Sequence, residues 1–525
     1  MHVKGIVFIG LLAGLTGLAA APAQSANFEC PRKGGELTFA SEAKINSLDM
    51  HASNAISTRN VAMNLYESLM TRNEKNEPIL ELADSLAVSP DGMSFTFKLR
   101  PGIHFHNGKE LSSADVVASF DRYAKIGLER AMLENVEKWE APDGATFVIR
   151  LKKAQPTFIE DLSSFSVPIV IIPAESKDDP PQRLNIVGTG PFQLVEFVPD
   201  SHVKLKRYEG YKPNTQLGER TGFGGYKVAC LDSINYRIVT EPGARVAGLE
   251  TGEFQAVEDV PTKAQAELKK NTKITLLPLE NWWIHAAYPN TAIPPTDNLL
   301  VRKAIQAALD MDEIMEASTD GAYRLNVGFQ YPGRITYTDA GKETYNIKNP
   351  ELAKKYLKEA GYNGEPLILL TNKDYTSMYN AALVVAEQLK AIGMNVKLEV
   401  LDWPASLQRW DKGGPGWNFF FNGTGTQPAL GPLATMKFFV PPTNIAYHPK
   451  DNVADPDLVA AYADMVSQPK AEDRQAAFAR MQKVILEKVY ALPFGSLTKV
   501  QAVRENVKGF TPFRIPRFSN VWLEN

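Results

Sequence analysis

The sequence predicts an α/β fold divided into two large lobes, and three observations support this prediction. The chain has 525 residues, whereas one hydrophobic core rarely organises more than ~250–300 residues. Short segments of strand-like alternation are interspersed with segments of helical periodicity, without a fixed repeat. Hydrophobic residues make up 44% and charged residues 22% of the chain. This composition is typical of a globular protein that can fill two such cores.

The first 26 residues have the pattern of a secretory signal peptide. One lysine precedes an apolar run from Ile6 to Leu18, and an A-x-A pattern follows at residues 21–23. The apolar run is short for a bilayer span, which needs roughly 20 residues. We expect cleavage near Ala23 or Ala26. No lipid anchor is expected, because Cys30 does not directly follow a small-residue box.

The charge and cysteine content exclude several classes of protein. A net charge of -3 gives no basic excess that would favour nucleic acid or anionic lipid. No later stretch is apolar for 18 residues, so a membrane span is not predicted. The two cysteines, Cys30 and Cys230, would meet oxidising conditions after export and could form one disulfide. Two buried free thiols are the alternative.

Sequence patterns typical of strands and helices alternate in the first part of the chain. Residues 35–40, GELTFA, predict a first strand. Residues 94–99, SFTFKL, alternate apolar and polar side chains and predict another strand, entered through a Pro90-Asp91-Gly92 turn. Residues 112–115, SSAD, predict a helix N-terminus, because a hydroxyl can cap it and an acid in the first turn complements the helix dipole.

Helical periodicity returns in the second half of the chain. One helical face is predicted from Val301, Ala304, Ile305 and Ala308, and another from Ala382, Val385, Ala386 and Leu389. A strand-like segment follows each helix, and residues 394–401, MNVKLEVL, follow the second. This alternation predicts an α/β protein.

Two histidines, His104 and His106, raise the question of a metal site. They lie two residues apart at a predicted strand end, so both rings could face one side. The chain has no H-E-x-x-H motif and its other histidines are scattered, which favours a structural turn over a metal site. No G-x-S-x-G elbow is present, and Pro191 interrupts the glycine-rich residues 188–192 where a phosphate loop needs donor amides. No catalytic or metal-ligating residue is predicted.

The stretch from Ser89 to Phe120, SPDGMSFTFKLRPGIHFHNGKELSSADVVASF, resembles the signature of the family 5 extracytoplasmic solute-binding proteins. These are the dipeptide-, oligopeptide- and nickel-binding proteins of ABC importers. Further segments that are similar to this family occur in the same order along the chain: residues 64–69, 78–83, 188–192, 241–254, 301–305 and 353–362. In this family the histidine at position 106 is usual and structural.

The resemblance implies a two-lobed periplasmic binding protein fold of the class II type. Lobe I would comprise residues 27–286, including an extra subdomain over about 75–185, and lobe II residues 287–496. Residues 497–525 would return to lobe I, and two strands would cross between the lobes near residues 283–288 and 494–503. Cys30 and Cys230 would then both belong to lobe I, which makes their pairing plausible.

The resemblance also implies a function in solute import. The protein would be periplasmic and monomeric, would bind a small organic solute in a cleft between the lobes, and would deliver it to the permease subunits of an ABC transporter. Hinge closure around the solute would signal a loaded state. No enzymatic activity and no cofactor are predicted. The alternatives are a carrier of peptide, metal complex or haem on the same fold, a periplasmic chaperone, and a secreted hydrolase.

Ligand-binding residues are predicted mainly from aromatic side chains near the crossing strands and from the positions that line the cleft in relatives. An aromatic side chain in such a strand belongs to the core about as often as to a binding site, and alternation predicts that Trp282 and Trp283 face opposite ways. The predicted set is Ser41, Glu42, Trp282, Trp283, His285, Tyr375, Met378, Trp403, Trp417, Phe419, Phe421, Asn422, Thr424 and Thr426.

One departure from the family pattern concerns the class of solute. Peptide-binding members carry an acidic element after the tryptophan-glycine strand of lobe II, and its carboxylate holds the α-amino group of the peptide. Residues 424–430, TGTQPAL, contain no acid here. A buried ammonium without a counter-charge costs several kcal/mol. Ordinary peptides are therefore doubtful, and a neutral or anionic organic solute is predicted.

Overall fold

The computed structural model describes residues 27–75, 77–166, 168–332, 337–424, 433–468 and 470–524. The predicted signal peptide, residues 1–26, lies outside this part of the chain. Within the described part, none of the helices combines the length and the apolar character that a membrane crossing requires.

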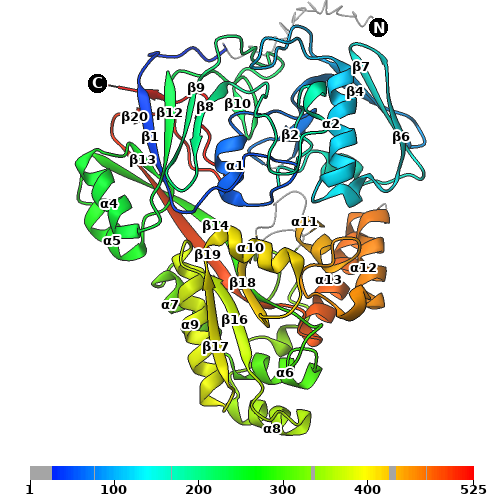
Figure 1. The fold of residues 1–525 in the computed structure, drawn as a ribbon, viewed down its shortest axis with the longest axis vertical. Helices are drawn as coiled ribbons and strands as arrows, with labels where there is room; N and C mark the ends of the chain where they lie inside the picture. Colours follow the sequence, from blue (N-terminus) through cyan, green and yellow to red (C-terminus); the bar gives the residue numbers. More distant parts are fainter. Residues whose placement is uncertain are drawn as a thin grey trace, which may run out of the picture.

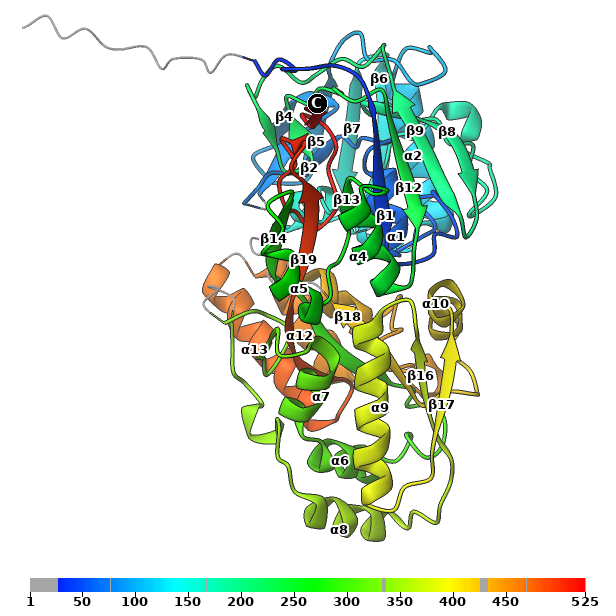
Figure 2. The same ribbon diagram turned by 90° about the vertical axis from the view of Figure 1, so that its left-hand side faces the viewer.

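Two lobes are joined by a pair of long antiparallel strands (Figures 1 and 2). These strands are β14 (Ile274–Pro289) and β19 (Leu492–Arg504), and they are neighbours at the centre of an 11-stranded sheet that continues into both lobes. The sheet has the order β17-β16-β18-β14-β19-β13-β1-β12-β9-β8, with β15 paired to β19. The strands β14 and β19 therefore connect the two lobes, and the sheet to which they belong extends into the core of each lobe.

Lobe I contains the first half of the chain and its C-terminal end. Its share of the long sheet includes a parallel pair, β1 and β12, in which Phe39 lies opposite Tyr236, and β9 and β8 continue the sheet beyond β12. A second sheet of order β4-β5-β7-β6 packs on α2 around its own apolar core. The elements are β1 (Glu36–Ser41), α1 (Ile56–Ala62), β2 (Met70–Arg72), β3 (Pro78–Leu80), β4 (Ala83–Val88), β5 (Ser94–Leu99), α2 (Ser113–Ile126), η1 (Arg130–Leu133), β6 (Val136–Asp143), β7 (Thr146–Leu151), α3 (Phe158–Leu162), η2 (Ala174–Ser176), β8 (Phe192–Val198), β9 (His202–Arg207), β10 (Arg220–Thr221), β11 (Gly224–Gly225), β12 (Ser233–Ile238), α4 (Pro242–Thr251), β13 (Ala256–Val257), α5 (Thr262–Leu268), β20 (Val507–Lys508) and β21 (Trp522–Leu523).

Lobe II is built on the other end of the long sheet. Helix α9 packs on β16 to β18, and the antiparallel pair α12 and α13 forms a separate layer (Figure 1). The elements are α6 (Leu299–Ala308), α7 (Met311–Thr319), β15 (Tyr323–Leu325), η3 (Lys342–Thr344), α8 (Pro350–Ala360), β16 (Leu367–Asn372), α9 (Thr376–Ala391), β17 (Val396–Leu401), α10 (Trp403–Lys412), β18 (Phe419–Thr424), α11 (Leu433–Met436), η4 (Lys437–Phe439), η5 (Lys450–Asn452), α12 (Pro456–Ser467) and α13 (Ala471–Glu487).

The predicted strands and helix faces are confirmed to within two residues, but the expectation that a strand follows each helix is wrong for α6, which is followed directly by helix α7. The strand predicted over residues 94–99 is β5, and the strands predicted over 35–40 and 394–401 are β1 and β17. Ser112 caps helix α2 in a capping box with Asp115, whose carboxylate accepts from the Ser112 backbone N–H at 2.9 Å. The predicted faces of α6 and α9 are both buried.

His106 is a structural residue that joins the signature loop to a tight glycine turn. The backbone N–H of Gly188 donates to Nδ1 of His106 at 3.2 Å, so Nε2 carries the proton and donates to the carbonyl of Gly190 at 3.0 Å. A Cβ atom at position 188 would lie 2.1 Å from the carbonyl oxygen of Leu65, which explains the glycine. The described residues contain no group of three or more side chains that could hold a metal.

Cys30 and Cys230 form a disulfide within lobe I. The S–S distance is 2.03 Å and the two Cα atoms are 5.6 Å apart, although 200 residues separate the cysteines in the chain. The bond attaches the segment before β1 to the segment before β12, where the Gly34 N–H also donates to the Cys230 carbonyl at 2.8 Å. The disulfide therefore links two segments within lobe I and does not cross the hinge.

Candidate functional site

A cavity of about 510 Å³ lies between residues 131–161 of lobe I and residues 437–466 of lobe II. Two smaller cavities between the lobes both have Trp283 in their walls. We call the larger one, about 290 Å³, the hinge cavity, because it lies beside β14 and β19. We call the smaller one, about 100 Å³, the arginine cavity, because Arg59 and Arg514 line it. The side chain of Tyr375 packs against Trp283 on one side and Trp403 on the other, at centroid distances of 5.4 and 4.9 Å.

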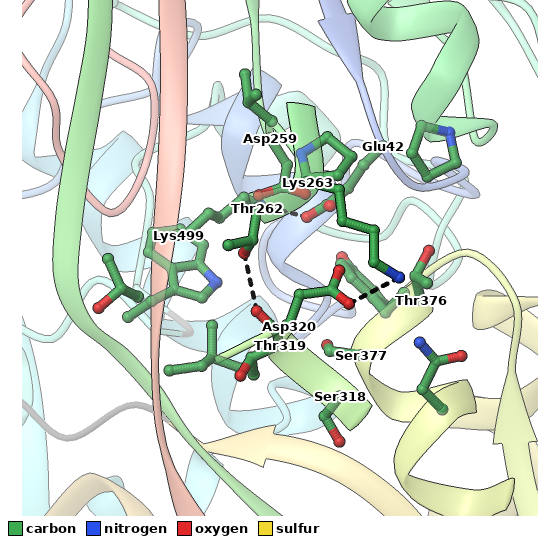
Figure 3. Close-up of a pocket in the computed structure, with 18 of the residues that line it drawn as sticks. Glu42, Asp259, Thr262, Lys263, Ser318, Thr319, Asp320, Thr376, Ser377 and Lys499 are labelled. Carbon is green, nitrogen blue, oxygen red and sulfur yellow. Dashed lines mark hydrogen bonds and ion pairs between the residues drawn. The ribbon is translucent and has the colours of Figure 1, made fainter. Parts of the chain in front are cut away.

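The hinge cavity is closed by contacts between helix α5 of lobe I and the end of helix α7 of lobe II (Figure 3). The hydroxyl of Thr262 donates to the Thr319 carbonyl at 2.8 Å, and Lys263 forms an ion pair with Asp320 at 2.9 Å. Lys263 is 83% exposed, so this ion pair contributes little to stability. These contacts show that the lobes are closed on this side.

A buried group of charges forms the lobe I wall of the hinge cavity. Lys499 forms ion pairs with Glu42 and, at 3.3 Å, with Glu258. Burial raises the pKa of Glu42 to about 7, although Lys499 opposes this shift. Because the charges of this wall are paired with one another, the hinge cavity offers few free charges to a ligand.

A bulge in β14 places both neighbouring tryptophans at the hinge cavity. The register of β14 against β19 shifts between Leu279 and Trp283, and Asn281 has a φ of 53°. Because the strand is irregular here, the alternation expected for Trp282 and Trp283 does not hold, and both line the same cavity. Their ring centroids are 5.8 Å apart.

The arginine cavity is built from both lobes. Lobe I contributes the loop and first turn of α1, the segment after α2 and the C-terminal segment; lobe II contributes α10, the end of β18, α11 and η4. The lining residues are Asn54, Ile56, Arg59, Glu129, Ser166, Trp283, Trp403, Leu407, Trp410, Asn422, Gly423, Thr424, Thr435, Phe438 and Arg514. A bound molecule would therefore contact both lobes at once.

Arg59 and Arg514 are the dominant charges of this cavity. Arg59 is buried and donates to the Ser166 carbonyl at 3.2 Å. Burial, followed by the nearby positive charge of Arg514, lowers the pKa of Arg59 to about 9. Burial also lowers the pKa of Arg514. Two guanidinium groups that repel each other in a small cavity are suited to a shared anionic ligand.

Ion pairs between the lobes flank the arginine cavity. Glu129 of lobe I pairs with Lys437 of lobe II at 2.5 Å, and Glu129 is only 2% exposed. Lys44 of lobe I lies 3.7 Å from Asp402 of lobe II. The lobes are therefore in contact on the side away from the hinge as well.

The predicted ligand-binding residues divide into three groups. Those that line a cavity are Glu42, Trp282, Trp283, Tyr375, Trp403, Asn422 and Thr424. Those that line neither are Ser41, His285, Met378, Trp417, Phe419 and Phe421, and all six are buried. Phe419 and Phe421 belong to β18, which pairs with β16 and β14 and is covered on both faces, and Trp417 packs edge-on against His448. Thr426 lies outside the described residues.

Several cavity residues were missed by sequence reasoning. Arg59, Glu129 and Arg514 carry no local signal, because a single arginine or glutamate in a sequence is usually solvated. The tryptophan at position 410 lies seven residues after Trp403 in "WPASLQRW", which places both on one face of helix α10. That spacing was the available signal for Trp410.

The side chain of Trp283 packs directly against Gly423. We expect replacement of Gly423 by alanine to disturb both cavities. A Cβ atom there would lie 2.4 Å from Cδ2 of Trp283, so the indole must move. We expect Gly423→Ala to lower the free energy of unfolding by about 1–3 kcal/mol and to change the near-UV circular dichroism. Gly144→Ala is the control, because a Cβ atom there meets nothing within 4 Å. Equal urea denaturation of the two variants would contradict this role of Gly423.

His285 is buried among apolar groups, and we expect its replacement by leucine to stabilise the protein, most strongly in acid. Neither ring nitrogen has a hydrogen-bond partner, and burial lowers the pKa of His285 to about 3. Unfolded histidine binds a proton below pH ~6.5, so the wild type loses about 2 kcal/mol of stability between pH ~6.5 and ~5 through this group. The melting temperature of His285→Leu should therefore exceed that of the wild type by a margin that grows over this range. A margin independent of pH would contradict this expectation.

A family model described as bacterial extracellular solute-binding proteins, family 5 Middle, matches residues 77–446. Among curated proteins, the chain is 28% identical over 524 residues to the glutathione-binding protein GsiB of Escherichia coli O1:K1 / APEC, covering 97% of this chain and 96% of that protein. It is 24% identical over 475 residues to a probable peptide ABC transporter periplasmic-binding protein, y4tO, of Sinorhizobium fredii, covering 88% of each.

Solved structures with the same architecture are also found. The binding protein AgaA of A. tumefacien R10, in complex with agropinic acid, superposes with a TM-score of 0.81 at 25% identity, covering 94% of this chain and 99% of that one. A dipeptide binding protein from pseudoalteromonas sp. SM9913, in complex with Met-Leu, gives a TM-score of 0.83 at 21% identity, covering 93% of this chain and 100% of that one.

Proposed function

Because the chain belongs to the family 5 bacterial extracellular solute-binding proteins, we propose that it captures a small organic solute between its lobes and delivers it unchanged to an ABC importer permease. The observation that carries this proposal is the arginine cavity, whose walls come from both lobes. The relatives named above as binding proteins for glutathione and for agropinic acid support a small organic solute.

Closure of the lobes is the step that couples solute binding to transport. In an open arrangement, α10 of lobe II would lie away from Arg59, so contacts from the two lobes can add only when the lobes close around a solute. The paired strands β14 and β19 can act as the hinge, because both are long strands that the two lobes share. A permease can then distinguish the closed, loaded form from the open form.

Ordinary peptides are poor candidates for this solute. The only carboxylate among the described residues that line the arginine cavity is Glu129, and Lys437 already pairs with it. The α-ammonium of a peptide would instead meet Arg59 and Arg514, whose charges repel it. We expect neutral di- and tripeptides, such as Met-Leu and tri-alanine, to leave the melting temperature unchanged. Micromolar binding of either peptide in calorimetry would contradict this expectation.

Native mass spectrometry and solution scattering test the transport proposal. Protein purified without refolding should show a defined mass increment that disappears on denaturation, and the released compound should rebind. Rebinding should reduce the radius of gyration in small-angle X-ray scattering, because the lobes close. A compound released in chemically altered form, or binding without any change in the radius of gyration, would refute the proposed function.

A further inference from the structure

The arginine cavity contains an excess of positive charge. Arg59 and Arg514 form no ion pair with a carboxylate of the described residues. The charge of Glu129 acts on Arg59 from nearby, but Glu129 is also shared with Lys437, which pairs with it at 2.5 Å. The lining residues therefore carry two cations and one anion, and Lys437 behind the wall already pairs with that anion. Charges that are removed from water without a partner are unfavourable, so the wall is incomplete without an anionic ligand.

Three hydrogen-bond acceptors of the wall already have a donor, whereas the carboxylate oxygens of Glu129 have the ion pair with Lys437 and no hydrogen bond. The side-chain oxygen of Asn422 accepts from the Gly423 N–H at 2.7 Å. The Ser166 carbonyl accepts from Arg59, and the hydroxyl of Thr424 bonds with the hydroxyl of Tyr288 at 3.2 Å. A ligand that mainly donates hydrogen bonds would therefore have to share Glu129 with Lys437.

The donors of the wall remain unpaired. Nε of Arg59, Nε of Arg514 and the indole nitrogens of Trp283, Trp403 and Trp410 are buried without an acceptor. All five belong to residues that line the arginine cavity. Because a buried donor without a partner is unfavourable, a ligand that supplies acceptor atoms would be favoured over one that supplies donors.

We propose that the transported solute is an organic acid, and that Arg59 and Arg514 together bind its carboxylate in the arginine cavity. This inference rests on the proposed function and specifies its substrate class. The cavity of about 100 Å³ has room for a carboxylate and a few further atoms. The remainder of a larger solute would have to displace Trp283, which separates this cavity from the hinge cavity.

The shape of the wall favours a carboxylate over a phosphate or sulfate. A guanidinium group is planar and matches the two coplanar oxygens of a carboxylate in a bidentate pair. Trp403 and Trp410 provide broad apolar surfaces beside the two arginines, and a carboxylate attached to a hydrocarbon or aromatic group can use both. A tetrahedral oxyanion would leave these surfaces without a partner.

Matched acids and amides test the proposal without knowledge of the natural solute. The probes are malonate, succinate, glutarate, citrate and glutathione, compared at constant ionic strength with malonamide, succinamide and glutaramide, and with sulfate and phosphate. We expect at least one carboxylate to raise the melting temperature at millimolar concentration, and the amides to have no effect. Equal effects of acids and amides, a larger effect of sulfate or phosphate, or no effect of any acid would each overturn the proposal.

Two variants locate the site of acid binding. Arg59→Met and Arg514→Met should each weaken binding of the responsive acid in calorimetry by roughly tenfold to a hundredfold. Arg480→Met is the control, because Arg480 pairs with Asp464 on the exposed surface of the α12 and α13 layer, and it should bind the acid as the wild type does. Wild-type affinity in both cavity variants would overturn the proposal.

Stability in the absence of the acid separates a binding role from a structural one. Because Arg59 and Arg514 repel each other, removal of either charge should leave the ligand-free melting temperature unchanged or raise it, while acid binding is lost. If both variants instead lost stability in proportion to binding, the arginines would be structural and the proposal would fall. Acid binding without lobe closure would preserve this inference and refute the transport function, so the two failures are distinguishable.

Discussion

Replacement of Lys227 by methionine is expected to lower the free energy of unfolding by about 3–5 kcal/mol, because it leaves two buried carboxylates without their cation. Lys227 pairs with Glu67 at 2.8 Å and with Glu81 at 2.7 Å, and its three donors are completed by the carbonyl of Phe223 at 3.0 Å. All three charged side chains are buried. The group attaches the chain that follows α1 to residues near position 227, and so it supports the helix that carries Arg59.

The loss of stability in Lys227→Met should be larger in alkali than in acid. Burial already raises the pKa of Glu81 to about 7 in the intact protein, above the ordinary value of 4.5, and removal of Lys227 can only raise it further. A carboxyl group whose pKa is raised on folding binds a proton in the folded state, so its contribution to stability falls as the pH rises from ~4.5 through the raised pKa. Urea denaturation at pH ~5 and ~8 measures this difference.

Two further variants control this prediction. Lys270→Met removes an exposed partner of Glu267 and should change stability by less than ~0.5 kcal/mol. The triple variant Lys227→Met, Glu67→Gln and Glu81→Gln removes the uncompensated charges and should recover a large part of the loss. If the triple variant were as unstable as Lys227→Met alone, packing of the lysine chain would be responsible for the loss instead of its charge.

The architecture could be predicted from local patterns, because the period of apolar residues determines which face of an element is buried. The alternation in residues 94–99 gave β5, and the spacing of Ala382, Val385, Ala386 and Leu389 gave the buried face of α9. The resemblance identified His106 and the glycine turn at residues 188–190 separately, and only the structure shows that hydrogen bonds join them.

The candidate site could be predicted only where the aromatic residues lie at the crossing strand or on α10. Trp283 and Trp403 were predicted on this basis, and both line the arginine cavity. Phe419 and Phe421 were predicted because they are also aromatic, but they are buried in a strand that is covered on both faces. Arg59 and Arg514 come from opposite ends of the chain. Their proximity is produced by the return of the C-terminal segment to lobe I, and no local period encodes it.

The buried charged residues were the feature of the structure that the sequence predicted least well. Lys227 and Arg122 have the composition of surface residues, and only the fold shows that each is buried with acidic partners. The bulge of β14 is similar, since the short-range sequence around Asn281 does not reveal the shift of register that places Trp282 and Trp283 at one cavity. Both features depend on pairing between distant segments.

Removal of the Cys30–Cys230 disulfide is expected to cost about 5 kcal/mol on the chain-entropy account, because the bond closes a loop of 200 residues in the unfolded chain. The variant Cys30→Ala, Cys230→Ala should therefore unfold at lower urea concentration than the wild type. Its unfolding should also have a steeper dependence on urea, because an unfolded chain without the cross-link is more expanded and exposes more surface.

Reduced wild-type protein separates the cross-link from the packing of the cysteine side chains. Cys230 is fully buried, so the alanine variant also loses a packed sulfur atom, whereas reduction leaves that atom in place. If the cross-link dominates, the reduced protein and the double alanine variant should have nearly the same urea midpoint, well below that of the oxidised protein. Because both cysteines lie in lobe I, acid binding in the arginine cavity should survive reduction wherever the protein remains folded. Loss of binding in folded, reduced protein would show instead that the disulfide acts on the cleft.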